Sequence, residues 1–231
     1  MEQVYTFWEG TMPDYIKLCM RTWKFDYVVL NYENLHKHTD WKVPDRLKQF
    51  PLPKIADVIR VHILRDNGGY WLDADTIMLG NDLPKENIFG YPETRENTIG
   101  FLHTEAHSDM FEEWAKYQDG VVANIDNLRD TWKIVGNEFT DPYILNHSEI
   151  TIADVTDTWP ETYMVNLNTT RRAKYLMFYF KRSYFLSDIH PTNMLLLHNS
   201  WTPDWYKVLD ESKIMKQTCT LSNILREVLN K

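Results

Sequence analysis

The stretch 63–80 constrains the fold of this 231-residue chain more than any other. Asn67-Gly68-Gly69 predicts the end of a helix, because Gly and Asn tolerate the left-handed conformation found at helix C-caps. Tyr70-Trp71-Leu72 has the aromatic and apolar character of a buried strand. Asp73-Ala74-Asp75 follows directly. The stretch therefore predicts a helix, a tight break, and a strand that ends in two acids.

The two acids of Asp73-Ala74-Asp75 are spaced so that they can act together. In an extended chain, residues i and i+2 point the same way, so both carboxylates can face one cation. Hard oxygen ligands suit Mg²⁺ or Mn²⁺, and such a site is completed by substrate phosphate oxygens. The alternative is a polar turn between strand and loop, which is the usual meaning of a bare D-x-D triplet. Two unpaired acids at the end of a buried strand, however, are costly without a cation.

Length and composition limit the classes of protein. A chain of 231 residues suits one domain, and 43% hydrophobic residues with 14% aromatic ones indicate a globular protein. The net charge of −8 argues against a general nucleic-acid binder. Cys19 and Cys219 form no metal-binding cluster and favour a reducing compartment. With no signal peptide and no run long enough to span a bilayer, we expect a cytoplasmic protein.

Strand, helix and strand alternate near the start of the chain. Residues 4–8 and 25–30 are apolar or β-branched, and Pro13 opens a helix between them. This order predicts an α/β sheet. Later segments extend the pattern less clearly. We expect strands at 98–102 and 150–155, helices at 108–118 and 221–229, and an apolar run at 194–197.

A second helix, at 54–67, leads into the two acids. Its apolar residues follow helical spacing, and Asp57 and Arg60, three residues apart, project from one face. An ion pair within the helix explains that spacing without any functional site. Because the helix feeds directly into Asp73 and Asp75, its polar face is also placed to flank the same cleft.

The run 171–187 differs in charge from the rest of this acidic chain. It contains five basic residues and no acid: Arg171, Arg172, Lys174, Lys181 and Arg182. Aromatic residues lie between them. Either the run is a helix packed on the sheet with solvated basic ends, or it lies against an anionic membrane surface.

Three segments of the chain resemble a known family. They are Y-T-F-W-E-G-T-M-P-D-Y-I-K-L-C-M-R-T-W from Tyr5, K-I-A-D-V-I-R-V-H-I-L-R-D-N-G-G-Y-W-L-D-A-D from Lys54, and H-N-S-W from His198. Together they resemble the D-x-D glycosyltransferases of the GT-A fold in the capsular polysaccharide synthesis and family 32 group, of which clostridial glucosylating toxins are distant relatives. The A-D-x-x-R helix followed at fixed distance by G-G-x-x-x-D-x-D is far more specific than the triplet alone. The resemblance covers the chain up to about Gly80 and the short late motif.

This resemblance implies an architecture. The fold class would be α/β, with a GT-A-type, Rossmann-like mixed sheet flanked by helices and a helical C-terminal elaboration. A single domain would cover 1–231, in which 1–105 bind the nucleotide sugar and 106–231 form the acceptor part and the C-terminal motif.

The resemblance also implies roles for residues in the first part of the chain. Phe7 and Trp8 would bind the nucleotide, Trp8 by stacking on uracil. Asp57 would hydrogen-bond the ribose or sugar hydroxyls. Three residues would carry catalysis: Arg60 contacts the sugar, Asp73 binds the ribose and, through water, the metal, and Asp75 coordinates Mn²⁺ (or Mg²⁺) directly.

The late motif would complete the same site. Asn199 would be a further metal ligand, with His198 as a competing candidate for metal or phosphate. Ser200 and Trp201 would touch the diphosphate, and Ala74 would lie against the donor. The chain departs from the family at Asp141-Pro142, where relatives carry Gly-Pro in an acceptor loop.

The implied activity is metal-dependent transfer of a hexose from a UDP-sugar to a glycan acceptor, with retention and without a catalytic base. The acceptor would be a bacterial capsule or exopolysaccharide unit on a lipid carrier, or a glycoprotein glycan. A lipid-linked acceptor would place this cytoplasmic protein at the inner face of the membrane, in contact through residues 171–187.

Two other classes remain open. L-D-A-D-T fits the D-x-D-x-T signature of haloacid-dehalogenase-type phosphatases, although these carry the motif near the N-terminus and a downstream G-D-x-x-x-D, and no G-D dipeptide occurs here. The nine Trp and thirteen Tyr also suit a non-catalytic nucleotide-sugar binding module.

Overall fold

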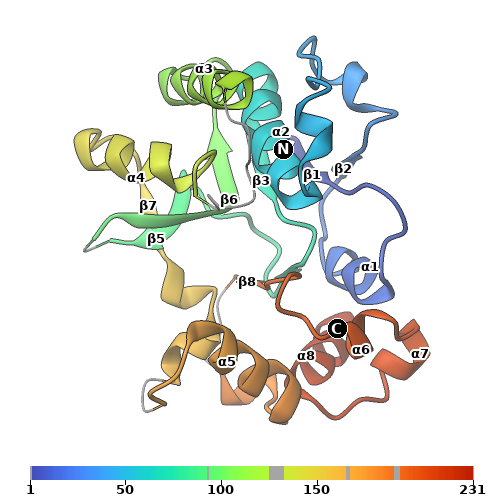
Figure 1. Ribbon diagram of the computed structural model, residues 1–231. Helices are drawn as coiled ribbons and strands as arrows, with labels where there is room; N and C mark the ends of the chain where they lie inside the picture. The colour runs from blue at the N-terminus through green and yellow to red at the C-terminus, as the bar shows by residue number, and fades with distance from the viewer. Residues whose placement is uncertain (1, 93, 125–132, 165–166, 190–192, 231) are drawn as a thin grey trace. The chain divides into compact units, whose positions relative to one another are not determined.

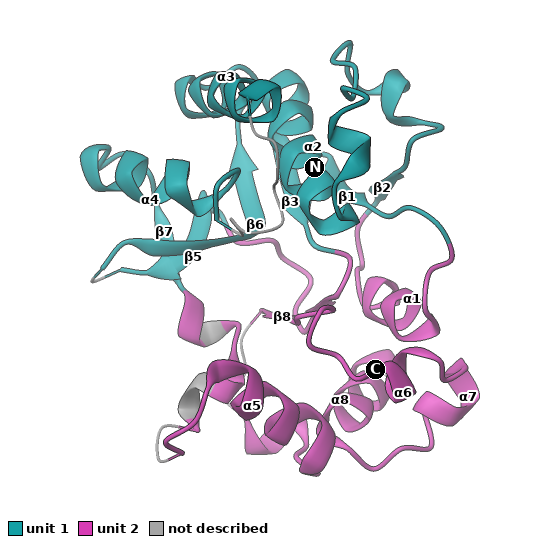
Figure 2. Ribbon diagram, in the orientation of Figure 1, with its two compact units in different colours: residues 1–10, 26–73, 85–154 teal, residues 11–25, 74–84, 155–231 magenta. Residues whose placement is uncertain are grey.

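The computed structural model describes residues 2–92, 94–124, 133–164, 167–189 and 193–230 (Figure 1). The chain forms two compact units (Figure 2). Unit 1 comprises residues 1–10, 26–73 and 85–154; unit 2 comprises residues 11–25, 74–84 and 155–231. The units thus interleave along the chain. A single domain with parts 1–105 and 106–231 stays a prediction.

Unit 1 is built on a six-stranded sheet in the order β2-β1-β3-β6-β5-β7. The strands are β1 (Val4–Phe7), β2 (Tyr27–Leu30), β3 (Gly69–Leu72), β5 (Ile88–Tyr91), β6 (Glu96–Thr104) and β7 (Ile152–Asp154). β1 pairs in parallel with β2 and β3, and β5 with β7, whereas β6 runs antiparallel to β3 and β5. The helices of unit 1 are α2 (Leu52–Asn67), α3 (Asp109–Asn124) and α4 (Asn137–Asn146). The predicted mixed α/β sheet flanked by helices is confirmed.

The break between α2 and β3 forms as the sequence predicts. α2 ends at Asn67, and Gly68 and Gly69 follow with φ of +66° and +86°. A Cβ atom on Gly69 would lie 2.4 Å from the backbone oxygen of Gln3, which precedes β1. Glycine is therefore needed here both for the positive φ and for the close approach of two neighbouring strands.

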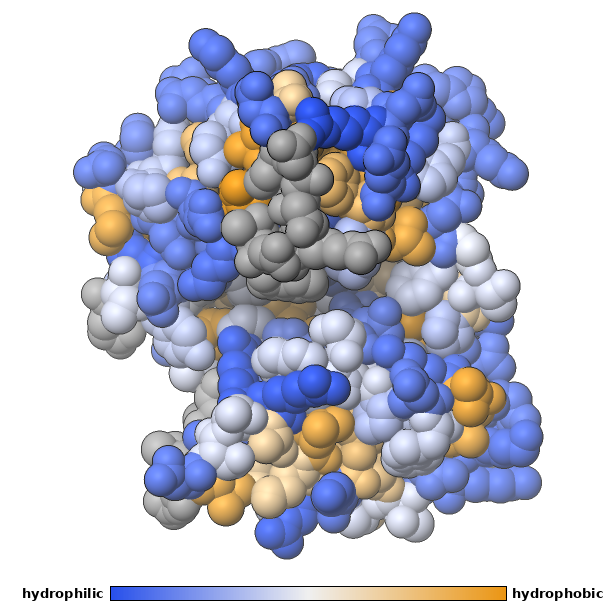
Figure 3. Space-filling view, in the orientation of Figure 1, coloured by the Kyte–Doolittle hydropathy of each residue, from blue (hydrophilic) through white to orange (hydrophobic). Residues whose placement is uncertain are grey.

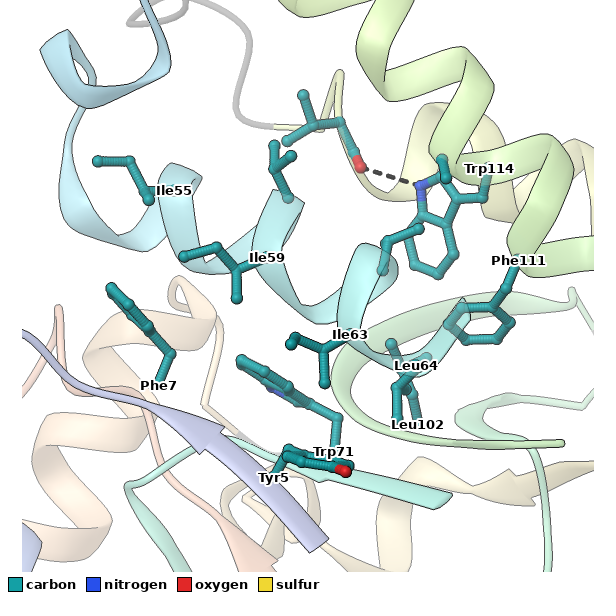
Figure 4. Packing of buried hydrophobic residues seen from close by; sticks show 14 of the residues in the cluster. Tyr5, Phe7, Ile55, Ile59, Ile63, Leu64, Trp71, Leu102, Phe111 and Trp114 are labelled. Carbon is teal, nitrogen blue, oxygen red and sulfur yellow. Dashed lines mark hydrogen bonds between the residues drawn. The ribbon is translucent and has the colours of Figure 1, made fainter. Parts of the chain in front are cut away.

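The core of unit 1 lies between the sheet and α2 (Figure 4). Ile59 and Ile63 of α2 face Trp71 of β3, and all three side chains are buried. Trp114 of α3 extends this core, and its Nε1–H donates to the backbone oxygen of Val135 at 3.0 Å. Burial of such side chains contributes about 1.5–3 kcal/mol each, so the sheet and α2 hold each other in place.

Unit 2 is mostly helical. Its only regular strands among the described residues, β4 (Thr76–Met78) and β8 (Met194–Leu196), pair antiparallel. Its helices are α1 (Asp14–Arg21), α5 (Arg171–Leu176), a π-helix (Met177–Lys181), α6 (Asp204–Lys207), α7 (Glu211–Ile214) and α8 (Thr220–Leu229). The predicted helix at 221–229 is confirmed as α8. In the described part of the chain, no helix has the length and apolar character needed to cross a membrane.

The pair Asp141-Pro142, where relatives carry Gly-Pro in an acceptor loop, lies inside α4. Asp141 is also held from outside the helix, because its Oδ1 accepts a hydrogen bond of 3.2 Å from the backbone N–H of Asn97. The pair at which this chain departs from the family's Gly-Pro is therefore helical.

Candidate functional site

Arg60 is the centre of a buried ionic cluster in unit 1. Its Nη2 lies 2.8 Å from Oδ1 of Asp57, one helical turn away, and 3.2 Å from Oδ1 of Asp73. Its Nη1 donates to the backbone oxygen of Ile99 on β6. The spacing of Asp57 and Arg60 thus does produce an intrahelical ion pair, as the simpler explanation predicted. The pair is extended by the first acid of the D-x-D motif.

Asp73 is positioned from three sides. Its Oδ1 accepts a hydrogen bond of 2.9 Å from Nε1 of Trp71, and its backbone N–H donates to the oxygen of Gly100 at 2.9 Å. A Cβ atom at Gly100 would lie only 3.0 Å from Oδ2 of Asp73, so glycine leaves room for this carboxylate. The Asp73 side chain is nevertheless 38% exposed. It is fixed in orientation and open to a ligand.

Burial dominates the electrostatics of Asp57. It raises the pKa of the Asp57 carboxyl to about 6, although the adjacent Arg60 guanidinium acts in the opposite direction. Desolvation of a carboxylate can outweigh a single ion pair in this way. The protonation state of Asp57 therefore depends on the charged groups that lie beside it.

The two aromatic residues predicted to hold the nucleotide lie in different surroundings. Phe7 is buried and packs edge-on against Tyr32, with ring centroids 5.7 Å apart. Trp8 is half-buried, its backbone N–H donates to the oxygen of Leu30 at 2.9 Å, and its buried Nε1 has no hydrogen-bond partner among the described residues. Trp8 is therefore accessible for stacking, whereas Phe7 belongs to the core.

The segment between β3 and β4 is not extended. Ala74 and Asp75 form a turn, so the geometric argument that residues i and i+2 of a strand point the same way does not apply here. Asp73 belongs to unit 1 and Asp75 to unit 2. Asp75 is nearly buried, at 8% exposure, and Ala74 is buried at 6%.

In unit 2, Asp75 meets the late H-N-S-W motif. Its Oδ2 accepts a hydrogen bond of 2.6 Å from the backbone N–H of Asn199, 124 positions further along the chain. The side-chain Oδ1 of Asn199 in turn accepts a hydrogen bond from the Tyr15 hydroxyl on α1. Burial and the charge of Asp75 raise the pKa of the Tyr15 hydroxyl, so it remains a donor. Tyr15 thus orients Asn199.

The rest of the late motif forms a short turn. The backbone N–H groups of Trp201 and Thr202 both donate to the oxygen of His198, at 2.9 and 3.0 Å. The backbone N–H of His198 donates to the Tyr175 hydroxyl at 3.3 Å. Ser200 is exposed and Trp201 is half-buried, so both are accessible to a ligand.

His198 is set among aromatic rings. Its ring centroid lies 4.0 Å from that of Trp201 and 5.3 Å from that of Trp159. Burial and the nearby Arg171 charge lower its pKa to about 3, so the imidazole is neutral at physiological pH. Its Nε2 is buried and has no hydrogen-bond partner in the parts of the chain that the structure describes. The hydrogen bond to Asp75 comes from the backbone of Asn199 rather than from the His198 ring.

The residues around Asp75 have the chemistry of a magnesium or manganese site. A carboxylate and an amide oxygen, both oriented by hydrogen bonds, are the hard ligands that these ions prefer. Among the described residues, no group of three or more His, Cys, Asp and Glu side chains is placed to hold a metal. A cation at Asp75 would therefore need oxygen atoms from Asn199, from water and from a phosphate.

Sequence reasoning missed Tyr15, Ile99 and Gly100. The Tyr15 hydroxyl and the Ile99 carbonyl each contact a predicted site residue, and Gly100 leaves space for one. Tyr15 stands inside the first segment that resembles the family, which was a signal for it. Nothing in the sequence marks Ile99, because its backbone oxygen rather than its side chain makes the contact.

The fold is that of a mixed α/β protein, in which Asp57, Arg60 and Asp73 form an ionic cluster in unit 1 and Asp75 meets Asn199 in unit 2. The chain belongs to the family of capsular polysaccharide synthesis proteins, whose family model matches residues 1–189. A solved structure named PaToxG Glycosyltransferase aligns with 64% of this chain and 70% of that chain, at 17% identity and a TM-score of 0.43. Among curated proteins, none matches this chain.

Proposed function

We propose that this chain is a metal-dependent glycosyltransferase that moves a hexose from a UDP-sugar to a glycan acceptor in capsule or exopolysaccharide synthesis, with retention of configuration. Membership of the capsular polysaccharide synthesis family supports the process. The observation that carries the proposal is the contact between Asp75 and Asn199, at 2.6 Å. It joins the D-x-D and H-N-S-W motifs, which the resemblance assigns to one site.

The proposed metal site consists of Asp75 and Asn199. Asp75 would bind Mn²⁺ or Mg²⁺ directly, and the side-chain oxygen of Asn199, which Tyr15 holds in place, would complete the protein's share of the ligands. When bound, the cation would neutralise the charge that develops on the leaving diphosphate. His198 is the less favourable ligand, because the neighbouring aromatic rings enclose it.

The residues of unit 1 would bind the nucleoside sugar. Trp8 would stack on the base, and the exposed side of Asp73 would accept hydrogen bonds from ribose hydroxyls. Arg60 is fixed by Asp57, Asp73 and Ile99, so it would contact the sugar without first being ordered. This preorganisation lowers the entropic cost of binding.

The transfer itself needs few groups from the chain. The bond between the anomeric carbon and the phosphate oxygen breaks, and a bond from the same face to the acceptor hydroxyl oxygen forms. The hydroxyl proton passes to the departing phosphate oxygen, so no side chain is required as base. The chain supplies orientation and exclusion of water.

Slow donor hydrolysis is the measurement that tests the proposal, because it requires no acceptor. The protein is incubated with a panel of nucleotide sugars, with Mn²⁺, with Mg²⁺ or with EDTA. We expect hydrolysis of a UDP-sugar that depends on the ion. Asp75→Ala should reduce the rate by about 10²-fold or more, a loss typical of removing one electrostatic contact to the transition state. Asp82→Ala, which removes an exposed acid of unit 2, is the matched control.

Three results would contradict the proposal. Full activity in EDTA, or in Asp75→Ala with an unchanged fold, would rule out the metal role. Release of phosphate from a simple phosphoester without dependence on a nucleotide sugar would indicate the phosphatase. Binding of UDP without turnover of any donor would indicate a binding module.

A further inference from the structure

Half-buried apolar residues lie along one side of α5 and of the π-helix that continues it. Tyr175, Phe178 and Tyr179 point inward and are buried. The other apolar side chains of this segment are only half-buried: Ala173, Leu176, Met177 and Phe180. Their positions follow the i, i+3, i+4, i+7 spacing of one helix face. The segment therefore has one buried apolar face and a second one that is only partly covered, through contacts of Phe180 with neighbouring rings.

Basic residues flank the outer apolar residues at both ends of the segment. Arg172 and Lys174 lie one helical turn before Leu176 and Met177, and Lys181 and Arg182 follow Phe180 directly at the end of the π-helix. Arg172, Lys181 and Arg182 are exposed. Among the described residues, none of these four basic side chains takes part in a salt bridge. Their charges are available to an external partner.

Further apolar residues lie beside this face. Trp205 of α6 is 48% exposed, and its ring centroid lies 6.2 Å from that of Phe180. Figure 3 shows orange and pale-orange residues over α5, next to blue hydrophilic ones. An aromatic ring with an apolar body and a polar N–H is suited to the boundary between lipid and water.

The distribution of charge between the two units indicates the kind of partner that this apolar face binds. Unit 2 carries 13 Lys and Arg against 10 Asp and Glu, a formal net charge of +3, whereas unit 1 carries 12 against 23, a net charge of −11. The apolar face thus lies in the positive unit of a negative protein. A half-buried apolar stripe with unpaired basic borders fits an anionic lipid surface, where the side chains can enter the headgroup region.

We infer that Ala173, Leu176, Met177 and Phe180, with Trp205 and the bordering Arg172, Lys181 and Arg182, form a surface that docks on anionic lipid bilayers. Binding is peripheral and reversible, because the stripe is short. The inference is independent of the glycosyl transfer proposed above, since none of these residues belongs to that site.

Vesicle flotation tests the inference directly. The full chain is mixed with vesicles of phosphatidylcholine alone or of phosphatidylcholine with phosphatidylglycerol. We expect binding only to the anionic vesicles, and loss of binding as salt rises from about 0.1 M to about 1 M. The triple variant Arg172→Gln, Lys181→Gln, Arg182→Gln should bind about 100-fold more weakly, since each basic residue near such a surface contributes about fivefold.

Control variants test whether binding to vesicles depends on this surface rather than on any exposed basic or apolar side chain. Lys116→Gln removes an exposed lysine of α3 in unit 1 and should leave binding unchanged. Met177→Gln should weaken binding severalfold, whereas Leu145→Gln, at a side chain of α4 that is 62% exposed, should not. Circular dichroism and thermal unfolding establish that each variant is folded.

The inference is overturned if folded wild-type protein binds neutral and anionic vesicles equally, or if the triple variant binds as wild type does. It is also overturned if the protein binds a soluble polyanion such as heparin but no vesicle, because the face would then recognise charge without a lipid surface.

Discussion

The two units of this protein differ in which charged groups they bury and in how these groups are compensated. Unit 1 is acidic overall, and the charge at its centre is a cation, Arg60, which two carboxylates and a carbonyl surround. Unit 2 is basic overall, and the buried charged side chains among its described residues are acids. Asp75 accepts a hydrogen bond from the backbone N–H of Asn199, and the fully buried Glu161 lies 3.8 Å from Arg171.

The difference shows how each unit is prepared for its proposed role. A buried cation with complete partners is a rigid positioning element, because any movement would break several contacts. A buried acid is costly, and it is retained where a cation or proton can compensate it. The ordered Arg60 of unit 1 suits the proposed contact with the donor, and the buried Asp75 of unit 2 suits the proposed cation.

Removing the central cation of unit 1 should have the largest effect. Arg60→Met leaves Asp57 buried without its partner, so we expect the free energy of unfolding to fall by about 3–5 kcal/mol. Urea unfolding measures the loss. In Asp57→Asn/Arg60→Met part of the loss should be recovered, because no uncompensated charge remains. If the single and double variants lost the same free energy of unfolding, Arg60 would not be the group that compensates the buried Asp57 charge. The contrast between the units would then not hold.

The second prediction concerns the buried acid of unit 2. Burial raises the pKa of Glu161 from 4.5 to about 7. The folded protein therefore holds a proton that the unfolded chain loses, and stability present below about pH 4.5 is lost as the pH rises to about 7. This loss amounts to about 3 kcal/mol.

Glu161→Gln should remove this dependence, so that the variant gains stability over wild type between those pH values. Chemical unfolding at several pH values provides the measurement. Glu211→Gln, an exposed acid that pairs with Arg21, is the control and should follow the wild-type profile. Parallel profiles for wild type and Glu161→Gln would mean that this carboxyl is ionised at neutral pH.

The smallest predicted effect comes from a comparison of two buried tyrosines of unit 2. It tests whether Tyr15 acts by orienting Asn199 or only by packing. Tyr15→Phe and Tyr206→Phe each remove a hydroxyl from a buried ring; the Tyr15 hydroxyl donates to Asn199, and the Tyr206 hydroxyl hydrogen-bonds Ser222. Both should cost about 1 kcal/mol of stability. Only Tyr15→Phe should raise the Mn²⁺ concentration needed for half-maximal donor hydrolysis. An equal shift in both variants would show that Tyr15 acts through packing alone.

Local signals predicted the elements that local interactions determine. The end of α2 at Asn67, the strand β3 and the helix α8 follow from Gly-Gly, aromatic and apolar patterns that need no knowledge of the rest of the chain. The ion pair of Asp57 and Arg60 follows from helical spacing. By contrast, β5 was missed, because its four residues include Gly90 and its pairing with β6 and β7 is what stabilises it.

The contacts that build the site could not be predicted in the same way. Tyr15 and Asn199 are 184 positions apart, and no periodic pattern links them. The turn at Ala74 and Asp75 replaces the expected extended segment, because pairing of Thr76–Met78 with β8 redirects the chain immediately after Asp73. The two apolar faces of α5 also need the structure, since a run that is aromatic throughout does not reveal which side is covered.

The interleaving of the units has a consequence for how such proteins can change. The backbone passes from one unit to the other five times, after residues 10, 25, 73, 84 and 154. No single crossover in the gene can therefore exchange one half for that of a homologue, and neither half can be produced as one uninterrupted fragment. New specificities in this lineage should arise by substitution within an intact scaffold rather than by shuffling of modules.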